Sequence, residues 1–201
     1  MTVFFHGNFG LSRARMSELA KLAIAEPSLS DRELAKKFGY GAPFAAVYRS
    51  WLHKCGISEL RKPFRLTTYG EIILIGDPNF QSDVTKWFFH FELTKDPGRA
   101  EVWHFFMNEF RNSHPIFTKD ELMQRLMMKL MPHDEKHFGP ESKMNPVIVR
   151  KLLECYSNDD ALGTLGLLTK EADDTFRFTD QATLGPWSSP EELEKELTSS
   201  R

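Results

Sequence analysis

Helix-start and helix-stop signals recur at short intervals through about the first 75 residues, and they restrict the fold more than any other feature of the chain. Ser30 and Glu33 form a Ser-x-x-Glu capping box, which is typical of the first turn of a helix. Pro27 and the run Gly39-Tyr40-Gly41 interrupt the helical pattern on either side of it. The spacing therefore predicts three short helices, at 13–25, 31–38 and 42–54.

A predicted β-hairpin follows these helices. Two short alternating segments, 57–60 and 64–67, are joined by a basic turn, and a further helix begins at Thr67 or Thr68. Three helices, a hairpin and a returning helix are the order of a winged helix-turn-helix, in which the last helix of the trio enters the major groove of DNA. We therefore expect a winged helix-turn-helix domain over residues 1–78, in a mainly α protein with short β-hairpins.

The charge distribution favours DNA as the partner of this first module. The whole chain has a net charge of −2, but residues 1–65 contain 11 Lys and Arg against 5 Asp and Glu, whereas the remainder contains 15 against 23. Basic side chains in this part of the chain would neutralise DNA phosphates. The candidate DNA-binding residues are Tyr48, Arg49 and Lys54 on the third helix and Arg61, Lys62 and Arg65 in the wing. A protein-interaction role for the winged helix is the alternative.

Residues 79–185 are expected to form a second, helical domain, followed by a tail over 186–201 that is either a short capped helix or frayed. The helix predicted at 99–111 is so apolar that it should lie at the centre of the protein. A Thr-x-x-Glu capping box at 118–121 starts another helix. A second hairpin, 166–169 and 175–179, repeats the Phe-Arg-x-Thr of the first one. Either the two halves are two winged-helix-like units, or this four-residue repeat is a coincidence. The acidic turn of the second hairpin would repel phosphate and is expected to meet protein or metal instead.

Few residues point to catalysis, because nucleotide-binding, nucleophile-elbow and zinc signatures are absent from the sequence. The loop 132–141 carries two histidines and three carboxylates, and magnesium would prefer Asp134 and Glu135; a solvated charged loop is the alternative. Asn108 and Glu109 lie on the most apolar helix, where an acid is either desolvated or paired to Arg111 or a lysine. His6 is either functional or part of a structural knot before the first helix.

The two cysteines, Cys55 and Cys155, are far apart in the chain, and each is expected to be a buried apolar residue without a disulfide. No stretch has the length of apolar sequence that a membrane-spanning helix needs, and the first residues do not have the pattern of a signal peptide. These features predict a cytoplasmic protein.

Several segments resemble a bacterial family associated with DNA phosphorothioation and formerly of unknown function. They are 5–9 with Arg13, 48–52, 87–93, 106–110 and 117–122, and together they span most of the chain. The resemblance extends to the B component of the single-stranded, Ssp-type, phosphorothioate modification system, which is a magnesium-dependent DNA nickase. The chain departs from the family at His6, where the family has a fuller Gly-His-Glu-x-Phe type of sequence.

The resemblance implies that this protein nicks one strand of double-stranded DNA so that sulfur can be inserted, in defence against phage. The implied partners are a cysteine desulfurase, an ATPase and a sulfur transferase, and a homodimer is one expected assembly. Asn108 and Glu109 match the family pattern, and with His6 they are the catalytic candidates; Asp134, Glu135 and Glu109 are the candidates for holding Mg²⁺. The alternative is a non-catalytic DNA-binding adaptor or regulator that recruits the modification enzymes.

Overall fold

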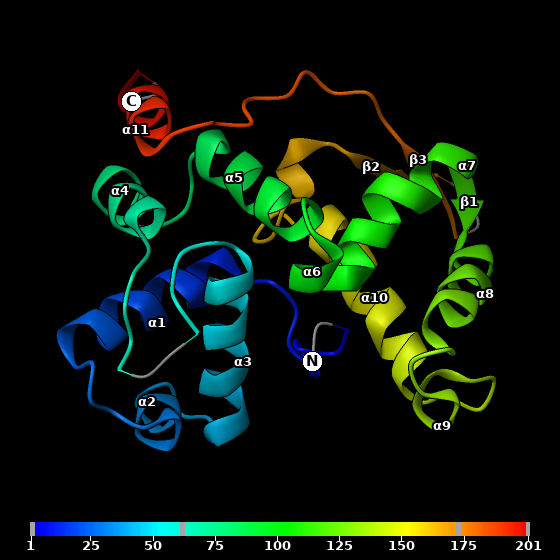
Figure 1. The fold of residues 1–201 in the computed structure, drawn as a ribbon, viewed down its shortest axis with the longest axis horizontal. Helices are drawn as coiled ribbons and strands as arrows, with labels where there is room; N and C mark the ends of the chain where they lie inside the picture. Colours follow the sequence, from blue (N-terminus) through cyan, green and yellow to red (C-terminus); the bar gives the residue numbers. More distant parts are fainter. Residues whose placement is uncertain (1–2, 61–62, 172–173, 200–201) are drawn as a thin grey trace. The chain divides into compact units, whose positions relative to one another are not determined.

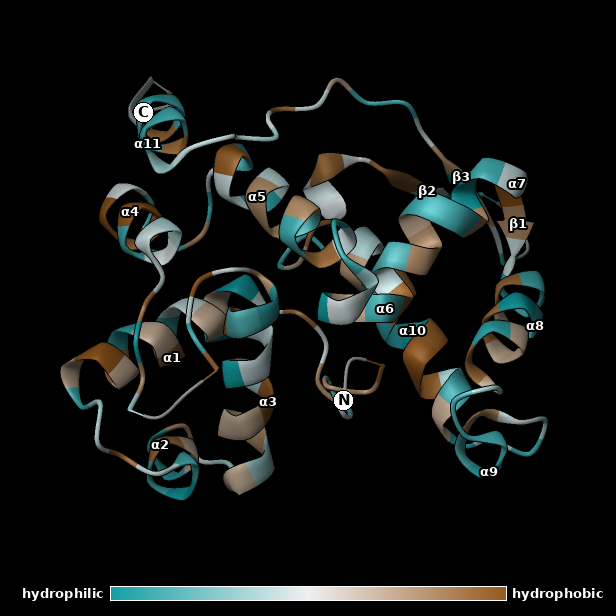
Figure 2. Cartoon of the chain, in the orientation of Figure 1, coloured by the Kyte–Doolittle hydropathy of each residue, from teal (hydrophilic) through white to brown (hydrophobic). Residues whose placement is uncertain are grey.

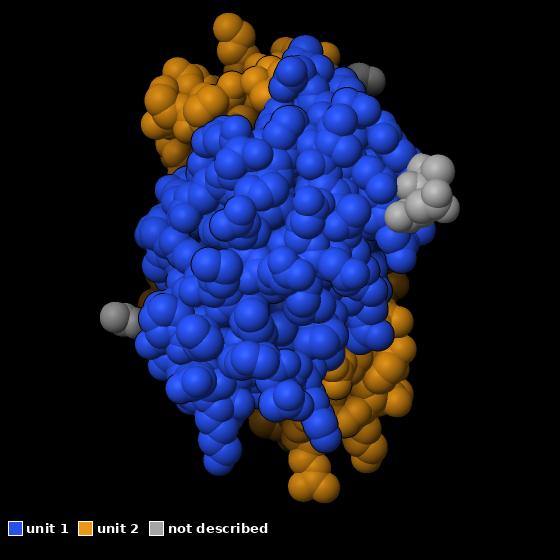
Figure 3. All heavy atoms as spheres, turned by 90° about the vertical axis from the view of Figure 1, so that its right-hand side faces the viewer, with its two compact units in different colours: residues 1–4, 94–182 blue, residues 5–93, 183–201 orange. Residues whose placement is uncertain are grey.

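The computed structural model describes residues 3–60, 63–171 and 174–199. They form two compact units, each built from segments distant in the sequence (Figure 3). Unit 1 comprises residues 1–4 and 94–182, and unit 2 comprises residues 5–93 and 183–201. These units group residues 79–93 and 183–201 with the first module, whereas the sequence analysis assigned them to the helical domain and the tail. No helix in the described ranges has the length and apolar character needed to cross a membrane.

Unit 2 contains the three short helices expected at the start of the chain (Figure 1). Ser30 accepts a hydrogen bond from the N–H of Glu33, whose side chain accepts one from the N–H of Ser30, so the predicted capping box is confirmed. Thr67 likewise caps the returning helix through the N–H of Gly70. The elements of unit 2 are α1 (Arg13–Ala25), α2 (Asp31–Lys37), α3 (Ala42–Lys54), α4 (Thr68–Gly76), α5 (Asp83–Thr94) and α11 (Pro190–Ser199).

The C-terminal segment is a helix of unit 2 rather than a frayed tail. Leu193 and Leu197 of α11 are buried, and α11 packs on α4. Four of the nine residues of α4 are isoleucine or leucine, and Figure 2 shows part of this helix in brown. Ile73 of α4 is buried, and α11 is the helix that packs on α4.

Unit 1 contains helices and a small sheet. Its helical elements are α6 (Pro97–His104), the π-helix η1 (Phe105–Phe110), α7 (Arg111–Ser113), α8 (Lys119–Leu130), α9 (Glu135–Phe138), α10 (Met144–Ser157) and the 3₁₀ turn η2 (Gly163–Leu165). Its strands are β1 (Ile116–Thr118), β2 (Leu168–Lys170) and β3 (Thr175–Phe178), which form an antiparallel sheet in the order β1-β3-β2. The sequence analysis predicted the β2–β3 hairpin and missed β1. Overall, the chain is mainly helical with a small antiparallel sheet.

The core of unit 1 is aromatic. Phe117 of β1 pairs with Phe176 of β3, and both side chains face the helices together with Phe178. Phe106 lies 4.8 Å from Phe178 and 5.8 Å from Phe117, measured between ring centres. The helix predicted at 99–111, which corresponds to α6 and η1, is buried on its aromatic face, and the sheet covers that face.

The two hairpins share more than the Phe-Arg-x-Thr sequence. In each hairpin, a threonine hydroxyl donates to the carbonyl of a glycine with positive φ. The N–H of the same threonine donates to the carbonyl of the residue directly after that glycine. The residues are Thr67, Gly56 and Ile57 in the first hairpin and Thr179, Gly166 and Leu167 in the second. Among the residues that the structure describes, the first hairpin is joined by an isolated antiparallel bridge between Ser58 and Leu66, whereas the second has paired strands. The repeat seen in the sequence is therefore a repeat of two threonine hydrogen bonds, one from the side chain and one from the backbone.

Candidate functional site

Tyr48 and Arg49 do not face solvent, so the sequence-based prediction for this face of α3 is wrong. Tyr48 is 1% exposed and its hydroxyl donates to the carbonyl of Gly10. Arg49 is 8% exposed, lies 3.6 Å from Asp31 and stacks over the ring of Phe64. The segment preceding α1 accepts a hydrogen bond from the Tyr48 hydroxyl, whereas Arg49 is buried beside Asp31 and Phe64.

The other predicted DNA-binding residues keep accessible charge where the structure describes them. Lys54 is half-buried, with its ammonium 5.6 Å from the centre of the Phe5 ring. Arg65 is exposed in the first hairpin and forms no ion pair with any residue that the structure describes. Arg61 and Lys62 lie outside the described residues.

His6 belongs to the packing of the N-terminal segment in unit 2. Its ring is fully buried, contacts Phe5 edge to face, and has Nδ1 2.8 Å from the carbonyl of Gly7. Trp51 secures the same segment, because its indole N–H donates to the carbonyl of Phe9. The environment of His6 favours the structural interpretation over the catalytic one.

Asn108 and Glu109 lie on η1, a π-helical turn in unit 1. Such turns occur frequently at functional sites, because the wider turn redirects side chains. The Asn108 amide donates to the carbonyl of Thr94 at 2.8 Å. Glu109 is exposed, and both of its carboxylate oxygens lie 2.9 Å from Nζ of Lys129 on α8. Of the two interpretations of Glu109, desolvated or paired to a basic residue, the pairing with a lysine is therefore the arrangement seen.

The histidine-rich loop acquires a carboxylate that the sequence pattern did not point to. Glu101 of α6 lies 2.7 Å from Nε2 of His133, and both line a cavity of about 350 Å³ together with Asp134 and His137. Asp134 caps the short helix α9, and the hydrogen bond from the His137 side chain, with that from its backbone N–H, holds the pKa of Asp134 below its usual value. Glu135 is exposed on α9.

The described residues do not fit the magnesium site expected from the sequence. Mg²⁺ needs several oxygen ligands in octahedral positions. Both oxygens of Glu109 are occupied by Lys129, and Asp134 is occupied by His137 in a separate cavity. Across residues 3–60, 63–171 and 174–199, no group of three or more His, Cys, Asp or Glu side chains is placed to hold a metal ion.

The cysteines are structural. Cys55 and Cys155 are buried and form no disulfide within the described part of the chain, as predicted. Burial raises the pKa of the Cys155 thiol to about 12, so the nucleophilic thiolate is scarce at neutral pH.

The fold of the chain is shared with two solved structures. Two crystal structures of SspB, one of them magnesium ion-bound, match the chain with TM-scores of 0.64 and 0.63 over 90% of its residues, at 15% and 14% sequence identity. The chain therefore has the fold of SspB. It spans 60% of the length of each of those SspB chains.

The sequence places the chain in a family. A family model matches residues 19–187, and the chain belongs to the family described as protein of unknown function (DUF4007). No curated protein sequence matches the chain.

Proposed function

We propose that this protein is a DNA-binding component of a phosphorothioation system. The fold shared with SspB over 90% of the chain carries the proposal, together with the resemblance of segments such as 87–93 and 117–122 to proteins of phosphorothioation operons. A cysteine desulfurase, an ATPase and a sulfur transferase are the partners that such a role requires.

We propose that each unit is a winged-helix module and that only unit 2, which contains the first hairpin, contacts DNA. Unit 1 has the element order helix, β1, α8, α10, β2, β3, with β3 central in the sheet, and unit 2 has three helices followed by the bridged hairpin. The equivalent arginines of the two hairpins differ in their neighbours. Arg177 pairs with Glu171 at 2.5 Å, whereas Arg65 is exposed and next in the chain to the basic turn. Net positive charge therefore remains only on the first hairpin.

Reversing the charge of the first hairpin is expected to weaken duplex binding. The variant Arg61→Glu, Lys62→Glu, Arg65→Glu should flatten the dependence of log K on log salt by about one unit for each phosphate that the protein no longer neutralises. Fluorescence anisotropy with a labelled duplex over a range of salt concentrations measures this slope.

Arg177→Glu is the matched control, since Arg177 occupies the position of Arg65 in the second hairpin and is already neutralised. The control should keep the wild-type slope. If both variants reduce the salt dependence of duplex binding equally, or if duplex binding does not depend on salt, a protein-interaction module would be favoured instead.

Strand nicking is a second candidate function, favoured by the magnesium ion-bound state of one SspB structure with this fold. If the chain is a nickase, purified protein should convert supercoiled plasmid to open circle with Mg²⁺ and lose this activity with a chelator. Glu109→Ala tests whether η1 takes part, and Glu154→Ala is the matched control, because Glu154 is a lysine-paired glutamate of the same unit with no proposed role. Intact duplex binding without conversion of the plasmid leaves the non-catalytic adaptor as the function.

A further inference from the structure

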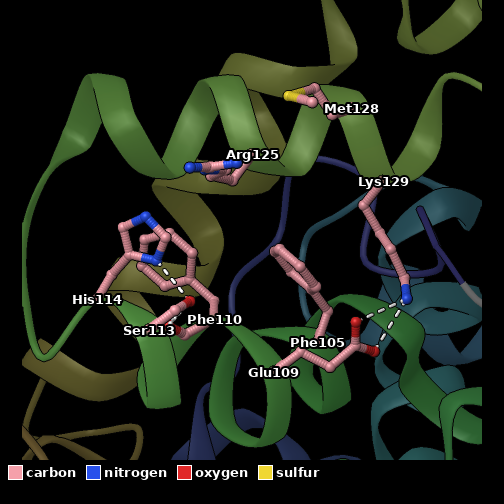
Figure 4. Close-up of a pocket in the computed structure, with 8 residues that line it drawn as sticks. All are labelled: Phe105, Glu109, Phe110, Ser113, His114, Arg125, Met128 and Lys129. Atoms are coloured by element: carbon pink, nitrogen blue, oxygen red, sulfur yellow. Dashed lines mark hydrogen bonds and ion pairs between the residues drawn. The ribbon is translucent and has the colours of Figure 1, made fainter.

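Unit 1 contains a pocket of about 460 Å³ between η1 with α7 on one side and α8 on the other (Figure 4). Its floor is apolar, because the rings of Phe105 and Phe110 lie there. Its polar groups come from both sides, with Ser113 and His114 after η1 and Arg125 and Lys129 from α8. Pockets of this size, apolar with a few convergent polar groups, are typical of sites for small molecules.

The spacing of α8 places its two cations on the pocket. Arg125 and Lys129 are four residues apart and therefore lie on one face of the helix. The Thr118 capping box and the buried side chains of Leu122 and Leu126 fix the orientation of α8. The site thus depends on the packing of α8 and not on a mobile loop.

The two cations differ in what they already bind. Lys129 is neutralised by Glu109 and lies 5.7 Å from the centre of the Phe105 ring. The Arg125 guanidinium forms no direct hydrogen bond or ion pair within the part of the chain that the structure describes, although Glu121, one turn earlier on α8, feels the charge of both Arg125 and His114. In Figure 4 the guanidinium extends towards the end of the pocket where His114 and Ser113 lie. A guanidinium beside an apolar wall is well suited to a planar or tetrahedral oxyanion, since it donates two parallel hydrogen bonds.

His114 is held in place at the same end. Its ring stacks flat on Phe110, with 4.5 Å between centres and 3° between planes, and its Nδ1 lies 2.8 Å from Oγ of Ser113. A fixed imidazole and a serine hydroxyl add hydrogen-bonding groups next to the guanidinium.

We infer that this pocket binds the phosphate of a nucleotide, with Arg125 as the principal anion ligand and the aromatic floor accommodating the remainder. A phosphate satisfies Arg125. The flat surface that the pocket offers a planar base is the His114 imidazole, since His114 is stacked on Phe110 and the Lys129 ammonium lies over Phe105. The nucleotide is either free or part of a single strand. The inference extends the proposed function to a second phosphate contact, outside the first hairpin.

Calorimetric titration of the full chain with a deoxynucleoside monophosphate, inorganic phosphate and a short single-stranded oligonucleotide tests the inference. Arg125→Gln should weaken binding by about tenfold or more, as expected when a charge-assisted hydrogen bond is removed, and Arg125→Lys by less. Binding of the monophosphate identifies a free nucleotide as ligand, and binding of the oligonucleotide alone identifies a strand.

Arg150→Gln is the matched control, because Arg150 is an exposed arginine of the same unit on α10 that pairs with Glu154 outside the pocket. Its affinities should stay within about twofold of wild type. Equal effects of Arg125→Gln and Arg150→Gln, or no binding of any probe, would overturn the inference. The triple variant of the first hairpin should bind the monophosphate or the oligonucleotide through the pocket as before, so a failure of duplex binding is distinguishable from a failure here.

Discussion

Phe117→Ala is expected to lower the free energy of unfolding of unit 1 by about 3–5 kcal/mol, the range found when a buried phenylalanine is truncated. Phe117 is 1% exposed and packs against four other aromatic rings, at 5.0–5.8 Å between centres. Its removal leaves a cavity at the point where β1 meets η1, which neighbouring rings on a sheet and a helix fill only in part. Urea denaturation followed by circular dichroism should show a midpoint lower by about 1 M or more.

Ile116→Ala is the control for this substitution. Ile116 precedes Phe117 on β1, but its side chain points to the opposite face of the sheet and is 45% exposed. The change should cost less than about 1 kcal/mol. If the two variants lose the same stability, the stability of unit 1 does not depend on the aromatic face of the sheet.

Gly70→Ala is expected to destabilise unit 2 by about 3 kcal/mol or more. A Cβ added to Gly70 would lie 2.0 Å from the carbonyl oxygen of Ile57, and this oxygen already accepts the N–H of Thr67. The clash is with backbone, so rotation of a side chain cannot relieve it, and α4 must move away from the first hairpin. Thermal unfolding should show a midpoint lower by about 6–12 °C for a chain of this size.

Gly41→Ala serves as the comparison, because Gly41 precedes α3 on the surface and an added Cβ would meet only Pro43 at 3.7 Å. Replacing glycine by alanine at this N-cap should cost no more than about 1 kcal/mol. A Gly70→Ala protein as stable as Gly41→Ala would show that α4 does not need its close approach to Ile57.

The candidate site could be predicted only in part, because periodicity shows which residues share a helix face but not which face is covered. On α3, the pattern allowed Tyr48 and Arg49 to face solvent, but the segment before α1 contacts Tyr48, and Arg49 is buried beside Asp31 and Phe64. On η1, the aromatic neighbours left Glu109 either desolvated or paired to a basic residue, and in the structure it is exposed and paired to Lys129. The pairing of residues 20 positions apart depends on how α8 packs, which is a tertiary contact.

Local structure could be predicted from neighbouring residues. Capping boxes such as Ser30 with Glu33 place helix starts within one turn, because they satisfy backbone groups near in the chain. The Phe-Arg-x-Thr repeat indicated both hairpins, although the threonine hydroxyls bind glycine carbonyls 11 and 13 residues away. The third strand, the packing of α11 on α4 and the pocket between η1 and α8 could not be predicted in this way. Each of these depends on side chains distant in sequence, whose burial lowers the free energy only after the chain has brought them together.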